Sequence, residues 1–139
     1  MQQKFFIIVL IILSILGLAT SAYLVYDHYN PNLQGSICDI TAAISCAVVN
    51  SGIYSTILGI PVALFGVLWF LILGLLSWNT LKGKKCSKYL LGWNILGMLF
   101  VIYFIYIEIL LTTICPFCTV VHVLAIFSLI LSLLLYKKL

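Results

Sequence analysis

Charge is the scarcest property of this sequence. Only 7% of its 139 residues are charged and 65% are hydrophobic, and its mean hydropathy is +1.29. A soluble domain of this size has no way to bury so much apolar surface. Internal repeats and low-complexity segments are also absent, and the length leaves no room for a separate soluble domain. The composition therefore predicts a membrane protein with a single domain, residues 1–139.

Four long apolar runs account for most of the chain. The first, from Phe5 to Tyr26, carries no charge and would be about 33 Å long as a helix, which is enough to cross a bilayer. Its start also resembles a signal peptide, but the apolar character continues to Tyr26, which favours an uncleaved span. The sequence thus predicts an all-α bundle of four membrane-spanning helices, at about residues 5–26, 59–78, 89–112 and 116–136.

The longest polar connection, residues 27–58, joins the first two spans and contains Cys38 and Cys46. Apolar residues recur in it at helical spacing, which predicts a helix lying at the membrane interface with one face in lipid. These residues are Ile37, Ile40, Ile44 and Val48.

The basic residues predict how the chain is oriented. Four spans place all seven of them on one side of the membrane, which the positive-inside rule makes cytoplasmic, together with both termini. Cys38, Cys46, Cys115 and Cys118 then face outward, where disulfides persist, whereas Cys86 stays inside as a reduced thiol. Because topology accounts for the net charge, no nucleic-acid partner is expected. The basic residues are Lys4, Lys82, Lys84, Lys85, Lys88, Lys137 and Lys138.

A Cys-Pro-Phe-Cys motif, residues 115–118, joins the third and fourth runs. Pro116 suits the first position of a helix, which puts Cys115 near the N-cap and Cys118 in the first turn. Free amide groups and the positive end of the helix dipole stabilise a thiolate there. The motif is typical of redox chemistry. A static disulfide or two ligands of a metal site are the alternatives.

Two further polar residues fall near this motif. His122 follows Cys118 by one helical turn and would point the same way, where it can donate a hydrogen bond to a bound ring or simply pack between helices. Glu108 is the only acid inside a span, and such residues are often functional. It can supply protons, or it can be a protonated side chain bonded to a neighbouring helix.

Cys38 and Cys46 are eight residues apart, or about 12 Å along a straight helix. A disulfide requires Cα atoms within about 7 Å of each other. If the two cysteines pair, the segment must bend, and if it is helical they must separate. A mobile loop of this kind fits a shuttle that works by thiol–disulfide exchange, and an inert staple is the alternative.

Three stretches in combination resemble the vitamin K epoxide reductase family, in its microbial branch. They are residues 38–46 (CDITAAISC), 49–61, and 115–122 (CPFCTVVH). The resemblance covers nearly the whole chain. It implies a four-helix bundle that encloses a quinone, either menaquinone or ubiquinone, near the outer surface.

The resemblance also implies roles for individual residues. Cys115 and Cys118 correspond to the active-site pair, with Cys118 nearest the quinone, while Cys46 exchanges with Cys115 and Cys38 meets a thioredoxin-fold partner. Ser55 aligns with a family asparagine that hydrogen-bonds the quinone head. Two more family-based expectations concern the pocket and the partner. His122 falls where vertebrate enzymes carry a tyrosine that lines the pocket, and the partner is a separate protein. Glu108 is a further candidate for contact with the quinone, because it is the acid inside a span.

The sequence therefore predicts a monomeric enzyme of the cell membrane that oxidises extracytoplasmic thiols with a quinone and supports disulfide formation. One alternative is a quinone or vitamin K epoxide reductase whose main product is the reduced quinone. Another is a non-catalytic membrane subunit stapled by disulfides. The four outward cysteines allow three pairings, and the sequence leaves the resting pattern open.

Overall fold

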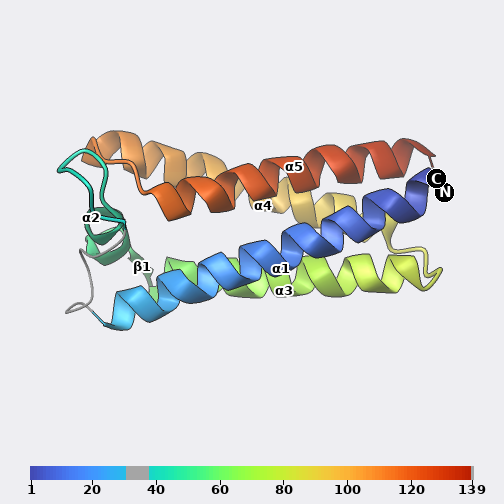
Figure 1. Cartoon of the computed structure of the whole chain (residues 1–139), viewed down its shortest axis with the longest axis horizontal. Helices are drawn as coiled ribbons and strands as arrows, with labels where there is room; N and C mark the ends of the chain where they lie inside the picture. Colours follow the sequence, from blue (N-terminus) through green and yellow to red (C-terminus); the bar gives the residue numbers. More distant parts are fainter. Residues whose placement is uncertain (31–37, 139) are drawn as a thin grey trace.

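A computed structural model describes residues 1–30 and 38–138 of the chain (Figure 1). In this part of the chain, helices α1, α3, α4 and α5 are long, and α2 and a two-stranded hairpin are short. The elements in order are α1 (Gln2–Tyr29), α2 (Cys46–Ser51), β1 (Thr56–Ile57), β2 (Ile60–Pro61), α3 (Val62–Leu81), α4 (Ser87–Leu111) and α5 (Pro116–Lys138).

The four long helices are each long and apolar enough to cross a membrane, which confirms the predicted four-helix membrane bundle. Helix α1 packs against α3 and α5, and α5 also packs against α4. Both termini and the α3–α4 connection lie at one end of the bundle, while α2 and the hairpin lie at the other (Figure 1). We call the described residues 38–61, which cover this second end, the cap.

The helices extend beyond the predicted spans at most ends. Helix α1 continues to Tyr29, and α5 begins at Pro116 as predicted but runs on to Lys138. Helix α3 begins only at Val62, three residues later than predicted, because residues 56–61 pair with each other as a hairpin.

The hairpin closes through a tight turn. Thr56 pairs with Pro61 and Ile57 with Ile60, so Leu58 and Gly59 are the two turn residues, with φ angles of 54° and 80°. Positive φ at both central residues is the requirement of a type I′ turn, whose twist matches that of the paired strands.

The predicted interfacial helix is largely wrong. Ile40 and Ile44 lie outside any helix, and only Val48 falls in α2, which is six residues long. Ile37 lies outside the described residues. The chain turns back between Thr41 and Ile44, which form an isolated antiparallel bridge. Helical spacing of apolar residues was therefore a poor guide here, because backbone pairing took the place of helical hydrogen bonds.

The half of the bundle that is nearer the two termini has an apolar core. Its buried members come from all four long helices, so each of these helices turns one face inward. They are Ile7, Leu10, Phe70, Leu73, Leu90 and Leu135.

Several polar side chains within the bundle donate hydrogen bonds inside it, although the buried Oδ1 of Asn94 has no partner among the described residues. The hydroxyls of Ser14 and Ser77 donate to the carbonyl oxygens four residues earlier in their own helices, at 2.7 and 2.8 Å. The amide of Asn94 in α4 donates to Ser132 Oγ in α5 at 2.8 Å. Such pairing is required in hydrocarbon, where no water replaces a missing partner.

Close packing of α1 on α3 depends on Gly17. A Cβ atom added at Gly17 would lie 2.2 Å from a ring carbon of Phe70, which is itself 1% exposed. The Gly17→Ala variant should therefore be less stable by about 1–3 kcal/mol, the usual range for overpacking a core. Thermal unfolding in detergent would measure this as a lower midpoint.

Gly92 in α4 is the matched control, because a Cβ atom there meets no atom within 4 Å. The Gly92→Ala variant should keep or slightly raise the midpoint, since alanine is the better helix former. Equal midpoints for the two variants would contradict this account of the α1–α3 contact.

Candidate functional site

Two backbone hydrogen bonds hold the cap onto the turn between α4 and α5. The N–H of Ser45 donates to the carbonyl of Ile114 at 3.0 Å, and the N–H of Ile114 donates to the carbonyl of Ala43 at 2.8 Å. They form a parallel bridge, which we call the clasp. Because Cys46 directly follows Ser45 and Cys115 directly follows Ile114, the clasp brings both cysteines to the same place.

The α4–α5 turn is shaped to reach the cap. Helix α4 ends at Leu111, and Thr112 has a left-handed backbone with φ of 51°, which is uncommon for a β-branched residue. The next residue, Thr113, is buried, and its hydroxyl donates to the carbonyl of Ala42 at 3.2 Å. The reversal thus adds a third bond between this turn and the cap.

Cys38 and Cys46 form a disulfide, with Cα atoms 5.5 Å apart. The eight-residue spacing allowed either a bent segment with paired cysteines or a helical segment with separated ones. The segment is bent, and the turn from Thr41 to Ile44 supplies the bend. Both cysteines are buried, with 7% and 2% of their surfaces exposed. The disulfide therefore belongs to a packed core at the cap end of the bundle and not to a loose surface loop.

Polar side chains fix the start of α2. Ser45 is the N-cap residue, and its hydroxyl accepts a hydrogen bond from the N–H of Val48. The carboxylate of Asp39 accepts hydrogen bonds from the Ser45 hydroxyl and from the N–H of Ala47. These bonds hold the pKa of Asp39 below its ordinary value of 3.8, outweighing the opposing effect of burial. The charged carboxylate of Asp39 thus accepts hydrogen bonds from the two neighbours of Cys46, Ser45 and Ala47, and so holds Cys46 in position.

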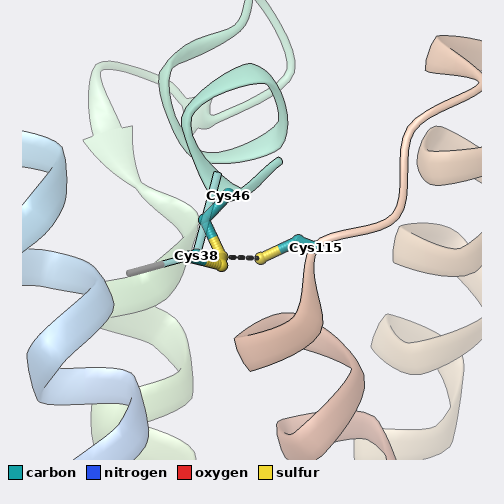
Figure 2. Close-up of side chains that lie close together, drawn as sticks. All are labelled: Cys38, Cys46 and Cys115. Carbon is teal, nitrogen blue, oxygen red and sulfur yellow. Dashed lines mark hydrogen bonds between the residues drawn. A yellow bond between two sulfur atoms is a disulfide. The ribbon is translucent and has the colours of Figure 1, made fainter. Parts of the chain in front are cut away.

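Cys115 faces this disulfide from the start of α5 (Figure 2). Its sulfur lies 3.0 Å from the sulfur of Cys46, and none of its surface is exposed. The N–H of Cys118 donates to the Cys115 sulfur at 3.3 Å, so a free amide of the first helical turn stabilises negative charge on this sulfur. A thiolate at Cys115 is therefore placed to exchange with the disulfide.

The three sulfur atoms of Cys38, Cys46 and Cys115 lie within 4.8 Å of one another. Metal ligation requires thiolates, and in this structure two of the three sulfurs are joined in the disulfide. The arrangement fits thiol–disulfide exchange. Cys86, the remaining cysteine, is half-buried at the start of α4 in the connection after α3.

A cavity of about 380 Å³ lies below the cap, between the helices. Three of the polar residues that the sequence singled out line it, namely Cys118, His122 and Glu108. Its walls are otherwise mostly apolar side chains of α3 and α4, including Phe65, Trp69, Trp93, Leu96, Phe100 and Val101. The cavity thus combines an apolar body with a few polar groups, as small-molecule sites do.

Two of these polar groups have features that suit a ligand. His122 is 7% exposed, and its ring stacks on Phe104 with centroids 6.3 Å apart. Glu108 Oε1 is buried and has no hydrogen-bond partner among the described residues. A carbonyl or hydroxyl of a bound ring would satisfy such groups.

Two residues with no role predicted from the sequence, Asn50 and Tyr54, line the roof of the cavity. The side-chain amide of Asn50 donates to the carbonyl of Leu24 at 2.8 Å and to Asp27 at 3.2 Å. Its backbone carbonyl lies 2.7 Å from a ring nitrogen of His28. Asn50 therefore ties α2 to the end of α1, and only its place in the family-like stretch 49–61 marked it in the sequence.

Ser55 lies apart from the other predicted ligand residues. It is 3% exposed, and its hydroxyl donates to the carbonyl of Gly52 at 2.6 Å. It is not among the described residues that line the cavity. The role that the family alignment predicts for Ser55 stays a prediction.

Comparison with known families supports the interpretation of this site. A model described as the vitamin K epoxide reductase family matches residues 8–133, which is nearly the whole chain. The match includes the clasp, all four cysteines of the site and the residues that line the cavity. A search among curated proteins found no matching relative.

The short distance between Cys46 and Cys115 predicts a disulfide between them when their usual partners are removed. The Cys38→Ser/Cys118→Ser double variant should form it under mild oxidation, because the two sulfurs already lie 3.0 Å apart. Mass spectrometry of peptides from the non-reduced protein would detect the link. Cys86 serves as the internal control and should stay unlinked. A Cys115 that remains reduced, or that pairs with Cys86, would contradict the geometry.

Proposed function

Because the chain belongs to the vitamin K epoxide reductase family, whose members are membrane oxidoreductases that act on thiols and quinones, we propose a direction and a partner for it. The protein oxidises a soluble thioredoxin-fold protein outside the membrane and passes the electrons to a membrane quinone. One observation carries this proposal, namely the position of Cys115 between the two halves of the site. Its sulfur touches that of Cys46, while Cys118, in the first turn of the same helix, lines the cavity.

The proposed cycle begins at the cap. A thiolate of the partner attacks Cys38, which breaks the Cys38–Cys46 bond and frees Cys46 as a thiolate. Cys46 then attacks Cys115 of an oxidised Cys115–Cys118 pair, which frees Cys118. The partner's second thiol then attacks the sulfur that the partner shares with Cys38, so the partner leaves with an internal disulfide and Cys38 is freed. Cys38 attacks Cys46 in the Cys46–Cys115 disulfide, which re-forms the Cys38–Cys46 bond and releases Cys115. The net result is an oxidised partner and a reduced Cys115 and Cys118.

The second half of the cycle takes place at the cavity. The Cys115 and Cys118 thiols form a disulfide and give up two electrons and two protons, which a quinone accepts. His122 and Glu108 contact the oxygens of the ring, and the apolar walls hold the rest of the molecule. The cavity volume, the unpartnered Glu108 oxygen and the apolar lining support a ligand of this kind.

The oxidation state of the structure fits this scheme. Cys38 and Cys46 are joined, whereas Cys115 and Cys118 are free. The scheme places this state directly before transfer of electrons to the quinone. Burial of Cys115 supports the order of events, because a soluble thiol cannot reach it except through the cap.

The orientation that we propose puts the cap outside the cell membrane and both termini in the cytoplasm. Its support is the distribution of charge: the termini and the α3–α4 connection, which carry the lysines, lie together at the end opposite the cap (Figure 1). We further propose that residues 1–139 act as one domain and as a monomer.

Purified protein in detergent, given a reduced thioredoxin-fold protein and a short-chain quinone, tests the proposal. Quinone absorbance should fall as the thiols are oxidised. The Cys115→Ala variant should abolish this change with any dithiol, because it removes the sulfur that connects cap and cavity. The Cys38→Ala variant should lose oxidation of the protein thiol but retain that of a small dithiol.

Cys86→Ala is the matched control and should leave both rates unchanged, because Cys86 lies in the α3–α4 connection and away from the site. An enzyme that turns over no quinone with any dithiol would reduce the cysteines to structural staples. Equal loss in the Cys38→Ala and Cys115→Ala variants with a small dithiol would overturn the division of labour between the two pairs.

His122 tests the proposed contact with the quinone. The His122→Phe variant keeps an aromatic ring against Phe104 but removes the hydrogen bond, so KM for the quinone should rise about tenfold, the effect of losing about 1.4 kcal/mol. The Ser128→Ala variant, on the same helix but outside the cavity lining, should leave KM unchanged. Steady-state kinetics with varied quinone would show the difference, and an unchanged KM in His122→Phe would exclude the contact. Ser55→Ala, measured alongside, tests the family-based assignment of that residue.

A further inference from the structure

Two tryptophans join α3 to α4 by a reciprocal pair of hydrogen bonds. The Nε1–H of Trp69 donates to the carbonyl of Trp93 at 3.2 Å, and the Nε1–H of Trp93 donates to the carbonyl of Trp69 at 3.0 Å. Within the described part of the chain, no other hydrogen bond is seen between these two helices. We call Trp69 and Trp93 the tryptophan pair.

The tryptophan pair lies inside the spanning helices and not at their ends. Tryptophan is enriched at the ends of membrane helices, where its ring meets the lipid headgroups. Trp78 has such a place in the last turn of α3, whereas Trp69 and Trp93 both lie more than one turn from either end of their helices. Anchoring at the membrane surface therefore does not explain the tryptophan pair.

The ring of Trp69 fits closely between its neighbours. A Cβ atom added at Gly97 of α4 would lie 2.5 Å from this ring, so only glycine leaves room for the indole there. The ring also meets that of Phe70 edge-on, with centroids 4.8 Å apart, which is a favoured aromatic geometry. Because Phe70 in turn packs on Gly17 of α1, a layer of rings extends from α4 to α1.

This layer marks the lower end of the cavity. Its three rings, those of the tryptophan pair and Phe70, all line the cavity. On α5 the lining extends from Cys118 to Ala125, which is about 10 Å along the helix. The core leucines nearer the termini do not line it, namely Leu73, Leu90 and Leu135. The layer is thus the floor of the cavity, about two helical turns below Cys118.

We propose that the tryptophan pair is a specificity-determining floor, which limits the site to quinones of one or two fused rings and holds the ring beside Cys118 and His122. This inference rests on the proposed function, because it takes the cavity as the quinone site. Neither indole can turn away without leaving its N–H unpaired in hydrocarbon, so the floor is stiff. A third fused ring would meet this floor and displace the quinone oxygens from His122.

Fluorescence locates the bound ring without turnover. The chain has three tryptophans, so the Trp78→Phe variant emits from the tryptophan pair alone. Because quinones quench an indole that they touch, 2-methyl-1,4-naphthoquinone should quench most of this emission and the effect should saturate. The Trp69→Phe/Trp93→Phe variant is the control, since it emits only from Trp78, outside the cavity lining, and should be quenched weakly. Equal quenching of the two variants would overturn the proposal.

Size selection tests the floor itself. In the Trp78→Phe background, Trp93→Leu lowers the floor, because leucine is shorter than an indole ring. The ratio of Kd for 2-methylanthraquinone to Kd for 2-methyl-1,4-naphthoquinone should fall about tenfold, within the usual range for pockets that discriminate by size. Quenching of Trp69 would give both constants.

Trp78→Leu is the matched control for size selection, because it makes the same substitution outside the cavity lining, and it should leave the ratio unchanged. Trp93→Phe in the Trp78→Phe background loses one hydrogen bond but keeps an aromatic ring, and it should lower the ratio to a smaller extent. This second variant gives an answer even where Trp93→Leu does not fold. A ratio that falls in neither variant, or that falls equally in Trp78→Leu, would overturn the floor.

The floor and the proposed oxidase activity can fail separately. Thiol-dependent quinone turnover without quenching of the tryptophan pair would overturn the floor and support the oxidase. Quenching and size selection without any turnover would support the floor and overturn the oxidase.

Discussion

The proposed exchange between Cys46 and Cys115 depends on the clasp, the pair of backbone hydrogen bonds between Ser45, Ala43 and Ile114. Neither Cys46 nor Cys115, the two cysteines proposed to exchange, is held in place by its own helix alone. Cys46 starts a helix of only six residues, and Cys115 precedes the first residue of α5. The clasp joins these two starts side by side, and so it sets the 3.0 Å between the sulfurs. Side-chain bonds from Asp39 and Thr113 support the same arrangement from either side.

The membrane explains why the few polar groups lie where they do. In hydrocarbon, a polar side chain must find its partner within the protein. The serines inside the bundle meet this need by bonding to their own helices, and Asn94 bonds to Ser132. Glu108 and His122 instead face the cavity, which leaves hydrogen-bonding capacity for a ligand. Polar groups within the bundle therefore divide into those that bond to their own or a neighbouring helix and those that face the cavity.

The cap and the bundle divide the chemistry between them. The cap holds the buried Cys38–Cys46 disulfide beside Cys115, whereas the bundle holds the cavity. Cys115 is fully buried between the two, which allows exchange with Cys46 while excluding water and foreign thiols.

Local patterns in the sequence determined the four membrane helices, the start of α5 at Pro116, and the grouping of lysines at one end. Each of these depends on residues close together in the chain, where hydrophobic length and helix-start preferences act directly. The same patterns were misleading for Ile40 and Ile44, which follow a helical period but lie in a turn. That turn, the pairing of Cys38 with Cys46, and the placing of Asn50 at the cavity roof were decided by the tertiary structure. The physical reason is that backbone pairing between residue 44 and residue 114 joins segments seventy residues apart, and hydrogen bonds of this kind leave no periodic trace in either segment.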